Sequence, residues 1–307
     1  MSNYSFAKVH GLKMALRKDD PGISTVLKKP LMNRRWHREP EFMSILEEYL
    51  SSDDIFFDLG CNIGYVTLYV LKKLSKKGFL YGIDPDIKNI LTLKKSLELN
   101  NLQNNYSIEN IALSSNNGEI AFEFSKESNL HKINKDISPK SPSYRKIKSY
   151  SFDTYFSDKR FPSFIKMDVE GAEIEILYGM KDFLKSSLKC KILMELHPTL
   201  YNPKKYKDAF KLLFDNGFRL EKFVGSSRAH NHPILKNNYT PNKIFKSGPF
   251  SRAVFENIKE DDFHALNLNK ESFVSRYNLI YYLFHPKTIF KPFLKSTKLS
   301  RAALFIR

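Results

Sequence analysis

Strand-like and helix-like segments alternate along most of this chain, and that order limits its fold more than any other feature. Short apolar runs typical of strands lie at residues 55–57, 79–83, 107–113, 119–124, 164–167, 191–196, 218–224 and 252–256. Segments with helical spacing of apolar residues lie at 39–49, 64–75, 86–100, 171–185 and 203–216. The alternation predicts an open, doubly wound, mostly parallel α/β sheet with right-handed crossovers. Ligands of such sheets bind beyond the carboxyl ends of the strands.

This pattern divides the chain into three regions. We expect a main domain at residues 51–256, with a helical extension on the substrate side at 1–50 and a further extension at 257–307. The polar segments 125–149 and 226–250 are predicted to be loops that shape the substrate site together with Trp36-His37-Arg38. The second loop also carries His230 and His232, which could bind a metal, although two histidines in a polar loop usually do not.

Composition excludes several classes of protein. Of the 307 residues, 42% are hydrophobic, which is enough for a packed core and excludes global disorder. The two cysteines, Cys61 and Cys190, exclude a disulfide scaffold and a multi-cysteine zinc site. We find no apolar stretch typical of a signal peptide or of a transmembrane helix, so we expect a cytoplasmic protein. The net charge of +17 suggests an anionic partner: nucleic acid, an anionic membrane or an acidic glycan.

Two motifs on consecutive strands point to a nucleoside ligand. The first strand leads into Asp58-Leu59-Gly60-Cys61-Asn62-Ile63-Gly64, where glycines permit a sharp turn next to a helix N-terminus. The second strand ends at Asp84, whose carboxylate can accept hydrogen bonds from both ribose hydroxyls. An acid at this place suits both NAD and S-adenosylmethionine. The G-x-x-x-G spacing is not the dinucleotide-binding G-x-G-x-x-G and favours S-adenosylmethionine.

Two further strands end in groups that could carry chemistry. Asp168 follows the strand at 164–167 and should point into the cleft, whereas Glu170 and Glu173 also suit the first turn of a helix. Glu195 and His197 lie two residues apart at the end of the strand at 191–196 and therefore share a face.

The motifs together resemble the FkbM family of S-adenosylmethionine-dependent methyltransferases. The resemblance rests on D-L-G-C-N-I-G (58–64), G-I-D-P (82–85), N-I-A-L-S-S-N-N-G (110–118), S-F-D-T-Y-F (151–156), F-I-K-M-D-V-E-G-A-E (164–173) and M-E-L-H (194–197). It covers about residues 38–225. It implies the class I methyltransferase fold, with a Rossmann-like, seven-stranded sheet whose last strand is antiparallel. It also implies methyl transfer to an oxygen, commonly a hydroxyl of a sugar or a polyketide-like product.

The resemblance also implies roles for cofactor-binding residues. Asp58, Gly60, Asn62 and Gly64 would line the methionine end of S-adenosylmethionine, Asp84 would hold the ribose, and Asn110-Ile111-Ala112 would lie near the adenine. Cys61 stands where the family usually has alanine, and Asp84 stands where glutamate is frequent. Both residues keep the size or charge that cofactor binding needs.

The sequence does not decide which residue acts as the catalytic base or whether a metal takes part. A hydroxyl acceptor must lose its proton as it attacks, and Asp168 and His197 are the candidate bases. Asp168 could instead orient His197, or it could hold Mg²⁺ together with Glu195.

Three other functions compete with this reading. An N-methyltransferase or nucleic-acid methyltransferase would suit the basic charge, but the chain has no Asn-Pro-Pro-Tyr or Asp-Pro-Pro-Tyr segment, and we expect no nucleic-acid partner. A dehydrogenase would need the missing G-x-G-x-x-G. A non-catalytic nucleoside-binding module would not need the acids on three strands.

The end of the chain is basic and rich in aromatic residues. Residues 272–307 hold seven basic and no acidic residues. This composition suits peripheral attachment to an anionic membrane, such as the inner membrane surface. An enzyme attached there would meet a substrate that is carried on a lipid. Alternatively, the apolar side chains pack back on the main domain, namely those of Tyr281, Leu283, Phe284, Ile289 and Phe293.

Overall fold

The computed structural model describes most of the chain. The described residues are 3–29, 35–102, 105–125, 127, 132–133, 137–202, 204–226, 234, 237–247, 250–266, 272–273, 297–298 and 300–307. His230 and His232, and the five apolar residues between 281 and 293 named above, lie outside these ranges.

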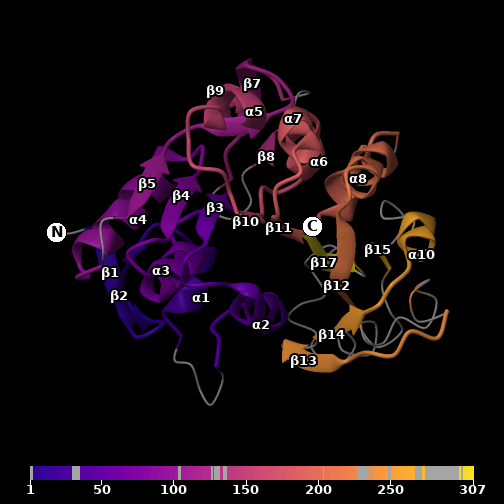
Figure 1. Cartoon of the computed structure of the whole chain (residues 1–307). Coiled ribbons are helices and arrows are strands. Elements are labelled where there is room, and N and C mark those ends of the chain that lie inside the picture. The colour runs from indigo at the N-terminus through magenta and orange to yellow at the C-terminus, as the bar shows by residue number, and fades with distance from the viewer. Residues whose placement is uncertain are drawn as a thin grey trace.

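A nine-stranded sheet in the described residues runs through the middle of the molecule (Figure 1). Its spatial order is β5 (Tyr106–Glu109), β4 (Phe79–Ile83), β3 (Ile55–Leu59), β10 (Phe164–Met167), β11 (Lys191–Glu195), β17 (Ser300–Ile306), β12 (Arg219–Ser226), β14 (Phe250–Glu256) and β13 (Lys243–Ser247). The strands from β5 to β11 are parallel to one another. The chain order reverses between β3 and β10, and this is the switch point at which ligands of such sheets bind.

The antiparallel strand inside the sheet is the end of the chain. β17 pairs antiparallel with β11 on one side and with β12 on the other. Residues 252–256, expected as the seventh strand, instead form β14 outside β12. The expected boundary at residue 256 therefore separates β17 from the sheet to which it belongs. The local sequence gives no sign of this pairing, because the partners of β17 lie about a hundred residues earlier.

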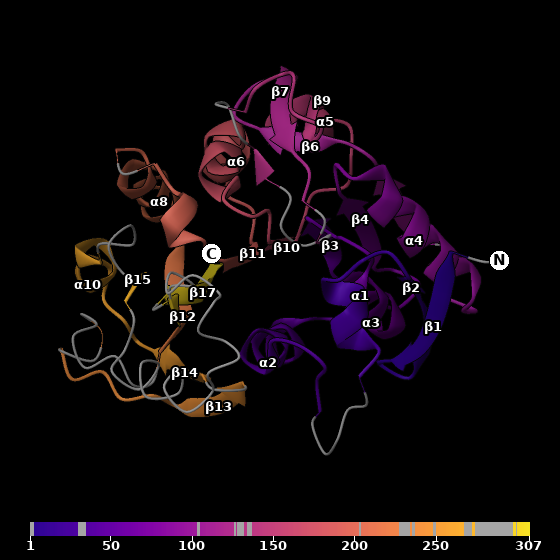
Figure 2. The same cartoon turned by 180° about the vertical axis from the view of Figure 1, so that it is seen from behind.

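Helices cover both faces of the sheet (Figures 1 and 2). One face carries α1 (Ile23–Leu27), α2 (Pro40–Tyr49), α3 (Tyr65–Lys73) and α4 (Ile87–Glu98), and the other carries α5 (Phe152–Phe156), α6 (Glu173–Gly179), α7 (Lys181–Lys185), α8 (Tyr206–Asp215) and α10 (Glu260–Ala265). Successive strand residues serve opposite faces. Phe57 packs into the core with α5 to α8, whereas Phe56 packs into the core with α2 and α3.

The N-terminal region contains helices, as expected, but it begins with a β-hairpin that was not expected. β1 (Tyr4–Val9) pairs with β2 (Leu12–Arg17), and the two residues between them, His10 and Gly11, have φ of 54° and 80°. Positive φ at both positions is the geometry of a tight two-residue hairpin turn. The hairpin packs on α4, where the Ala15 N–H donates to Ser96 Oγ at 3.0 Å. The turn was not predicted because His-Gly is not one of the pairs that mark a two-residue hairpin turn in a sequence, such as Asn-Gly or Asp-Gly.

A second sheet adjoins the first. Its order is β6 (Ala112–Ser114), β9 (Tyr144–Ser151), β7 (Gly118–Glu123) and β8 (Lys132–Ile133). The expected single strand at 107–113 is divided between β5 and β6, and the expected loop at 125–149 contains β8 and most of β9. β9 escaped prediction because most of its side chains are polar and exposed or half-buried. The remaining short elements are η1 (Pro198–Leu200), β15 (Ser272–Phe273) and β16 (Thr297–Lys298).

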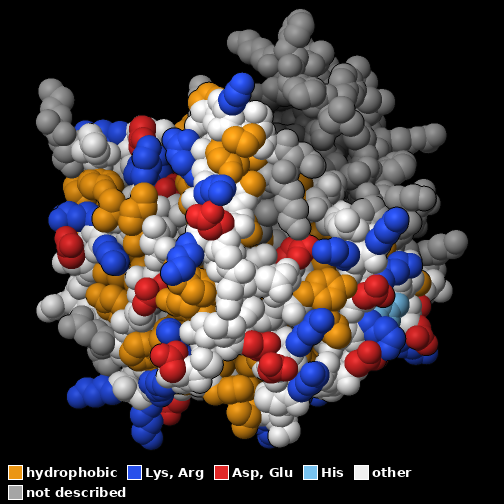
Figure 3. Space-filling model, turned by 90° about the horizontal axis from the view of Figure 1, so that it is seen from above, with side chains coloured by type: hydrophobic (Ala, Val, Ile, Leu, Met, Phe, Trp, Pro, Cys, Tyr) orange, Lys and Arg blue, Asp and Glu red, His pale blue; other side chains and the backbone are white. Residues whose placement is uncertain are grey.

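The described part of the chain contains no helix that is long and apolar enough to cross a membrane. Figure 3 shows one face of the molecule, on which basic and acidic side chains are interspersed and do not gather by sign.

Candidate active site

A cavity opens at the carboxyl ends of β3, β4 and β10, at the switch point of the sheet. Its volume is about 970 Å³, including the space at its mouth. The predicted site residues that line it are Gly60, Asn62, Asp84, Ala112 and Asp168. The other predicted site residues do not line the cavity, namely Asp58, Gly64, Asn110, Glu195 and His197.

The glycine turn after β3 forms one wall of the cavity. Gly60 has φ +80°, and a Cβ added there would lie 1.9 Å from the backbone oxygen of Asp168. The N–H groups of Gly60 and Cys61 both donate to the Ile83 carbonyl at 2.9 Å. Only glycine therefore fits at position 60, and the turn is tied to the ends of both β10 and β4.

Gly64 serves the packing of α3. Its φ is +95°, and an added Cβ would lie 2.3 Å from Leu93 Cδ1 on α4. The absent side chain lets α3 begin directly after the turn and lie close to α4.

Asp58 supports the turn from behind. Its side chain is fully buried, where it accepts a hydrogen bond from Thr67 Oγ1 at 2.7 Å and pairs with Lys166 Nζ at 3.0 Å. Lys166 lines the cavity and donates to the Gly60 carbonyl at 2.6 Å. Sequence reasoning gave Lys166 no role, although a lysine inside an apolar strand run needs a buried acidic partner.

Asp84 is fixed at the end of β4. Its carboxylate accepts hydrogen bonds from the N–H groups of Asn62 and Asp86, both at 2.9 Å, and from Asn89 Nδ2 at 3.2 Å. Burial raises the pKa of Asp84 to about 6, against the lowering effect of the two backbone hydrogen bonds. Asn110 Nδ2 donates to the Asp84 carbonyl at 2.9 Å, which ties β4 to the segment where Ile111 and Ala112 line the cavity.

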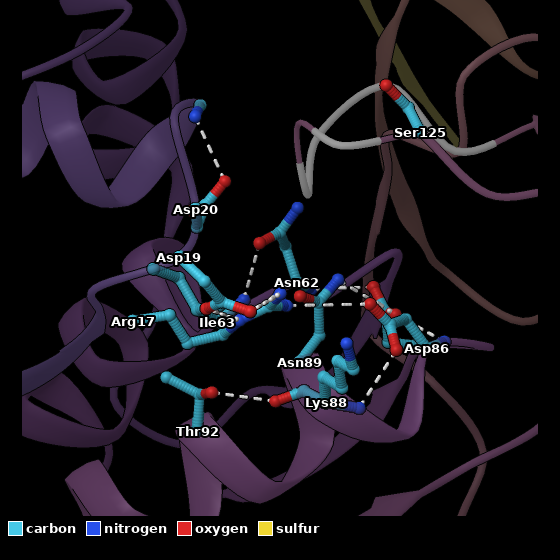
Figure 4. Close-up of polar contacts among 12 residues, drawn as sticks. Arg17, Asp19, Asp20, Asn62, Ile63, Asp86, Lys88, Asn89, Thr92 and Ser125 are labelled. Atoms are coloured by element: carbon cyan, nitrogen blue, oxygen red, sulfur yellow. Dashed lines mark hydrogen bonds and ion pairs between the residues drawn. The ribbon is translucent and has the colours of Figure 1, made fainter. Parts of the chain in front are cut away.

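The N-terminal hairpin reaches this loop, a contact that sequence reasoning missed. Arg17, the last residue of β2, donates from Nε to Asp19 Oδ1 at 3.1 Å, and its NH1 lies 3.7 Å from Asp86 Oδ2 (Figure 4). Asp86 also caps α4 by accepting from the Lys88 N–H at 2.8 Å. The charge pair joins the hairpin to the loop that carries Asp84.

His197 lies behind the other end of the cavity, surrounded by carboxylates. Its Nδ1 is 2.7 Å from Glu173 Oε1, and its Nε2 is 3.2 Å from Glu170 Oε2, 3.8 Å from Asp168 Oδ1 and 3.7 Å from Glu195 Oε1. Burial alone would lower the pKa of His197. The charge of Glu173, the hydrogen bond with Glu173 and the nearby carboxylate of Glu170 outweigh the effect of burial and raise this pKa well above its usual value.

Glu173 lies in the first turn of α6, as expected, but it has a second role as well. Its side chain is fully buried and holds His197. Glu170 has φ 49° and Gly171 has φ 99°, so the chain turns sharply here and brings both glutamates to the same histidine. The E-x-x-E spacing of Glu170 and Glu173 was the available signal.

The acids next to the cavity pair with arginines. Glu39, which lines the cavity with φ 45°, contacts Arg38 NH2 at 2.7 Å and Arg301 NH2 at 2.8 Å. Arg301 NH1 also contacts Glu195 Oε1. Asp168 itself lines the cavity, and burial raises its pKa, with Lys166 opposing and Glu170 reinforcing that shift.

Among the described residues, two groups of side chains have the composition of a metal site, but neither fits Mg²⁺ well. Oxygens of Glu39, Asp168 and Glu195 lie within 4.8 Å of one another, but the guanidinium of Arg301 already contacts two of the three. The second group, Asp168, Glu170 and His197, includes an imidazole whose raised pKa favours the protonated form, which has no lone pair for a metal.

Comparison with known proteins identifies the family to which this chain belongs. The sequence matches the family described as the Methyltransferase FkbM domain over residues 58–220, just over half of the chain. The chain belongs to the FkbM methyltransferase family. It is an S-adenosylmethionine-dependent methyltransferase, which confirms the resemblance, the expected fold class and the expected cofactor.

Individual relatives are more distant. The hexuronic acid methyltransferase AglP of Haloferax volcanii is 29% identical over 179 residues, which are 57% of this chain and 67% of AglP. The solved FkbM methyltransferase of Methylobacillus flagellatus matches with a TM-score of 0.42 and 15% identity over 67% of this chain and 44% of its own. The magnesium protoporphyrin IX methyltransferase of Synechocystis, solved with S-adenosylmethionine bound, matches with a TM-score of 0.36 and 11% identity over 70% of this chain and 74% of its own.

Proposed function

We propose that this chain transfers a methyl group from S-adenosylmethionine to a hydroxyl oxygen of a sugar or glycan. The observation that carries the proposal is the position of Asp168. Its carboxylate lines the cavity with a raised pKa, and its backbone oxygen lies against Gly60 of the glycine turn. A base therefore stands beside the loop that is expected to hold the methionine end of the cofactor.

The cofactor end of the cavity supports this assignment. Asp84 would accept hydrogen bonds from the ribose hydroxyls, Gly60 and Asn62 would border the methionine end, and Ala112 would border the adenine, since all four line the cavity. Asp58, Gly64 and Asn110 would act from behind by holding these elements in place.

Proton transfer falls to Asp168 in this proposal. When bound, S-adenosylmethionine supplies an electrophilic methyl group on a positively charged sulfur. The acceptor hydroxyl gives its proton to a carboxylate oxygen of Asp168, and burial makes that carboxylate a stronger base than usual. His197 does not line the cavity, and its raised pKa favours the protonated form, so it would be a positioning residue that holds Glu170 and Asp168.

The choice of a sugar rests on a relative and on local charge. AglP is named as a methyltransferase of a hexuronic acid, which is a sugar. Asp168, Glu170 and Glu39 line the same end of the cavity. Several carboxylates suit a neutral hydroxyl acceptor beside a cationic sulfur better than they suit a phosphate-rich nucleic acid.

Two measurements test this function. Isothermal titration should show binding of S-adenosylmethionine and none of NAD. Transfer of tritiated methyl groups should then be measured onto a panel of neutral sugars, uronic acids and nucleosides. We expect label on the sugar hydroxyls, located by mass spectrometry. Label on the nucleosides alone, or on no oxygen, would overturn the assignment. Asp182→Asn, which changes an exposed acid on α7, is the matched control for acid substitutions.

Membrane attachment remains a separate proposal. The described strand β17 belongs to the sheet, so a membrane contact would have to come from the basic and aromatic residues before residue 300. Flotation of the full chain with liposomes of anionic and of neutral lipid tests it. Failure to float with anionic liposomes at low salt would exclude the attachment.

A further inference from the structure

The last strand of the chain brings an arginine to the acidic side of the cavity. β17 is embedded between β11 and β12, and the side chains of Ala302, Ala303, Leu304 and Phe305 are fully buried. The Leu196 N–H donates to the Arg301 carbonyl at 2.7 Å, which fixes Arg301 next to the end of β11. The arginine is therefore placed by sheet pairing and not by a surface loop.

The guanidinium of Arg301 joins two acids from distant parts of the chain. NH1 contacts Glu195 Oε1, and NH2 lies 2.8 Å from Glu39 Oε1. Its side chain is 17% exposed, and those of Glu195 and Glu39 are 6% and 15% exposed, so water screens these charges weakly. Burial would raise the pKa of Glu39, but the charges of Arg38 and Arg301 hold this pKa at about 2.

The three acids Glu39, Asp168 and Glu195 lie so close together that they need a nearby positive charge. Oxygens of Glu39, Asp168 and Glu195 approach within 4.8 Å of one another, a distance at which buried carboxylates repel strongly. In many proteins a divalent cation holds a group of this kind together. Here the planar fork of one arginine reaches two of the three carboxylates and leaves Asp168 to face the cavity.

We propose that Arg301 is the built-in cation of this carboxylate group and takes the place that a divalent metal would otherwise fill. Arg301 does not line the cavity, so it is a positioning residue: it fixes Glu39 and Glu195 around Asp168. The role of Asp168 as base rests on the proposed function, but the occupation of the carboxylate group by Arg301 does not.

Direct titration with Mn²⁺ tests the proposal without acceptor or cofactor. The wild type should show no stoichiometric Mn²⁺ binding by isothermal titration or electron paramagnetic resonance. Arg301→Ala, checked for folding by circular dichroism, should bind one Mn²⁺ at least tenfold more tightly than the wild type. Adding Glu195→Gln to this variant should abolish the gain. Arg219→Ala, which removes an exposed arginine on β12, is the matched control and should behave as the wild type.

Two outcomes overturn the proposal. Tight Mn²⁺ binding by the wild type that is lost in Glu195→Gln would show that the acids hold a metal despite Arg301; this test needs no arginine variant to fold. Arg301→Ala that folds and gains no Mn²⁺ affinity would show that the guanidinium does not occupy a cation position.

A kinetic measurement separates positioning from mere stability. Arg301→Lys keeps the charge and should retain part of the methyl-transfer rate, whereas Arg301→Gln should lower kcat more than tenfold with S-adenosylmethionine affinity within about twofold of the wild type. Equal loss in both variants would contradict the positioning role. Failure of all methyl transfer in the wild type would instead count against the proposed function.

Discussion

His197 Nδ1 and Glu173 Oε1 lie 2.7 Å apart, and both side chains are almost or completely inaccessible to solvent. Glu170, Asp168 and Glu195 lie near the other ring nitrogen, so the imidazole is surrounded by four acids that favour its protonated form. In the proposed mechanism the histidine therefore has an electrostatic role, and proton abstraction falls to Asp168, whose carboxylate lines the cavity.

The first prediction concerns the charge of His197. Its pKa is raised above that of the unfolded chain, so its stabilising contribution is complete below about pH 6.5, the ordinary value, and is lost only as pH rises through the folded-state pKa. Nitrogen-15 NMR of histidine-labelled protein should show both ring nitrogens of His197 protonated at pH 7 to 8. A neutral ring at pH 7 would refute the electrostatic role and restore His197 as a candidate base.

The second prediction concerns cofactor binding and pH. The pKa of Asp84 is about 6, and in the proposed site the ribose hydroxyls would donate to its ionised carboxylate. Affinity for S-adenosylmethionine should therefore be full well above pH 6 and fall about tenfold per pH unit below it. Asp84→Ala should bind about 10- to 150-fold more weakly at pH 7.5, because a hydrogen bond to a charged group is worth about 1.5–3 kcal/mol. Calorimetry across pH 5 to 8 checks both, and unchanged affinity in the folded variant would remove Asp84 from the ribose site.

The third prediction compares two glycines with the same backbone conformation. Gly60 and Gly217 both have φ +80°, but an added Cβ meets the Asp168 oxygen at 1.9 Å in the first case and only Arg307 Cδ at 3.7 Å in the second. Gly217→Ala should cost about 1–2 kcal/mol of unfolding free energy from the left-handed backbone alone. Gly60→Ala should cost more and also weaken binding of S-adenosylmethionine. Equal losses of stability with unchanged cofactor binding would show that the contact with Asp168 is unimportant.

The fourth prediction tests the place of the last strand. Leu304 is fully buried in β17, whereas Leu188 is 50% exposed. Leu304→Ala should lower the unfolding free energy by about 2–5 kcal/mol, and Leu188→Ala should change it by less than about 0.5 kcal/mol. Denaturant unfolding measures both. Deletion of residues 300–307 should abolish cooperative unfolding, and a truncated chain that unfolds cooperatively with wild-type stability would contradict the pairing of β17.

Much of the fold could be predicted because the signals are local. The apolar runs at 55–57, 79–83, 164–167 and 191–196 all became strands of the main sheet, and the residues that follow them form the cavity. Each run is long enough to show its pattern, and parallel strands joined by helices leave few arrangements.

The missed features depend on pairing between distant residues. The apolar run Ala302-Ala303-Leu304-Phe305-Ile306 is itself typical of a central strand, but nothing near it in sequence shows that its partners are β11 and β12. Arg301 could be connected to Glu195 only through that pairing. Glu173 was assigned to a helix end because local electrostatics explained it adequately, while its contact with His197 spans 24 residues of sequence.

The rate of methyl transfer by Asp168→Asn tests the central claim most directly. It should be measured with the sugar that the wild type methylates best, at saturating S-adenosylmethionine, beside Asp182→Asn as the exposed-acid control. If Asp168 takes the proton of the acceptor hydroxyl, the variant should lose about 10²–10⁴-fold in kcat while its affinity for S-adenosylmethionine stays within a few-fold of the wild type. A folded Asp168→Asn variant with wild-type kcat would contradict the account.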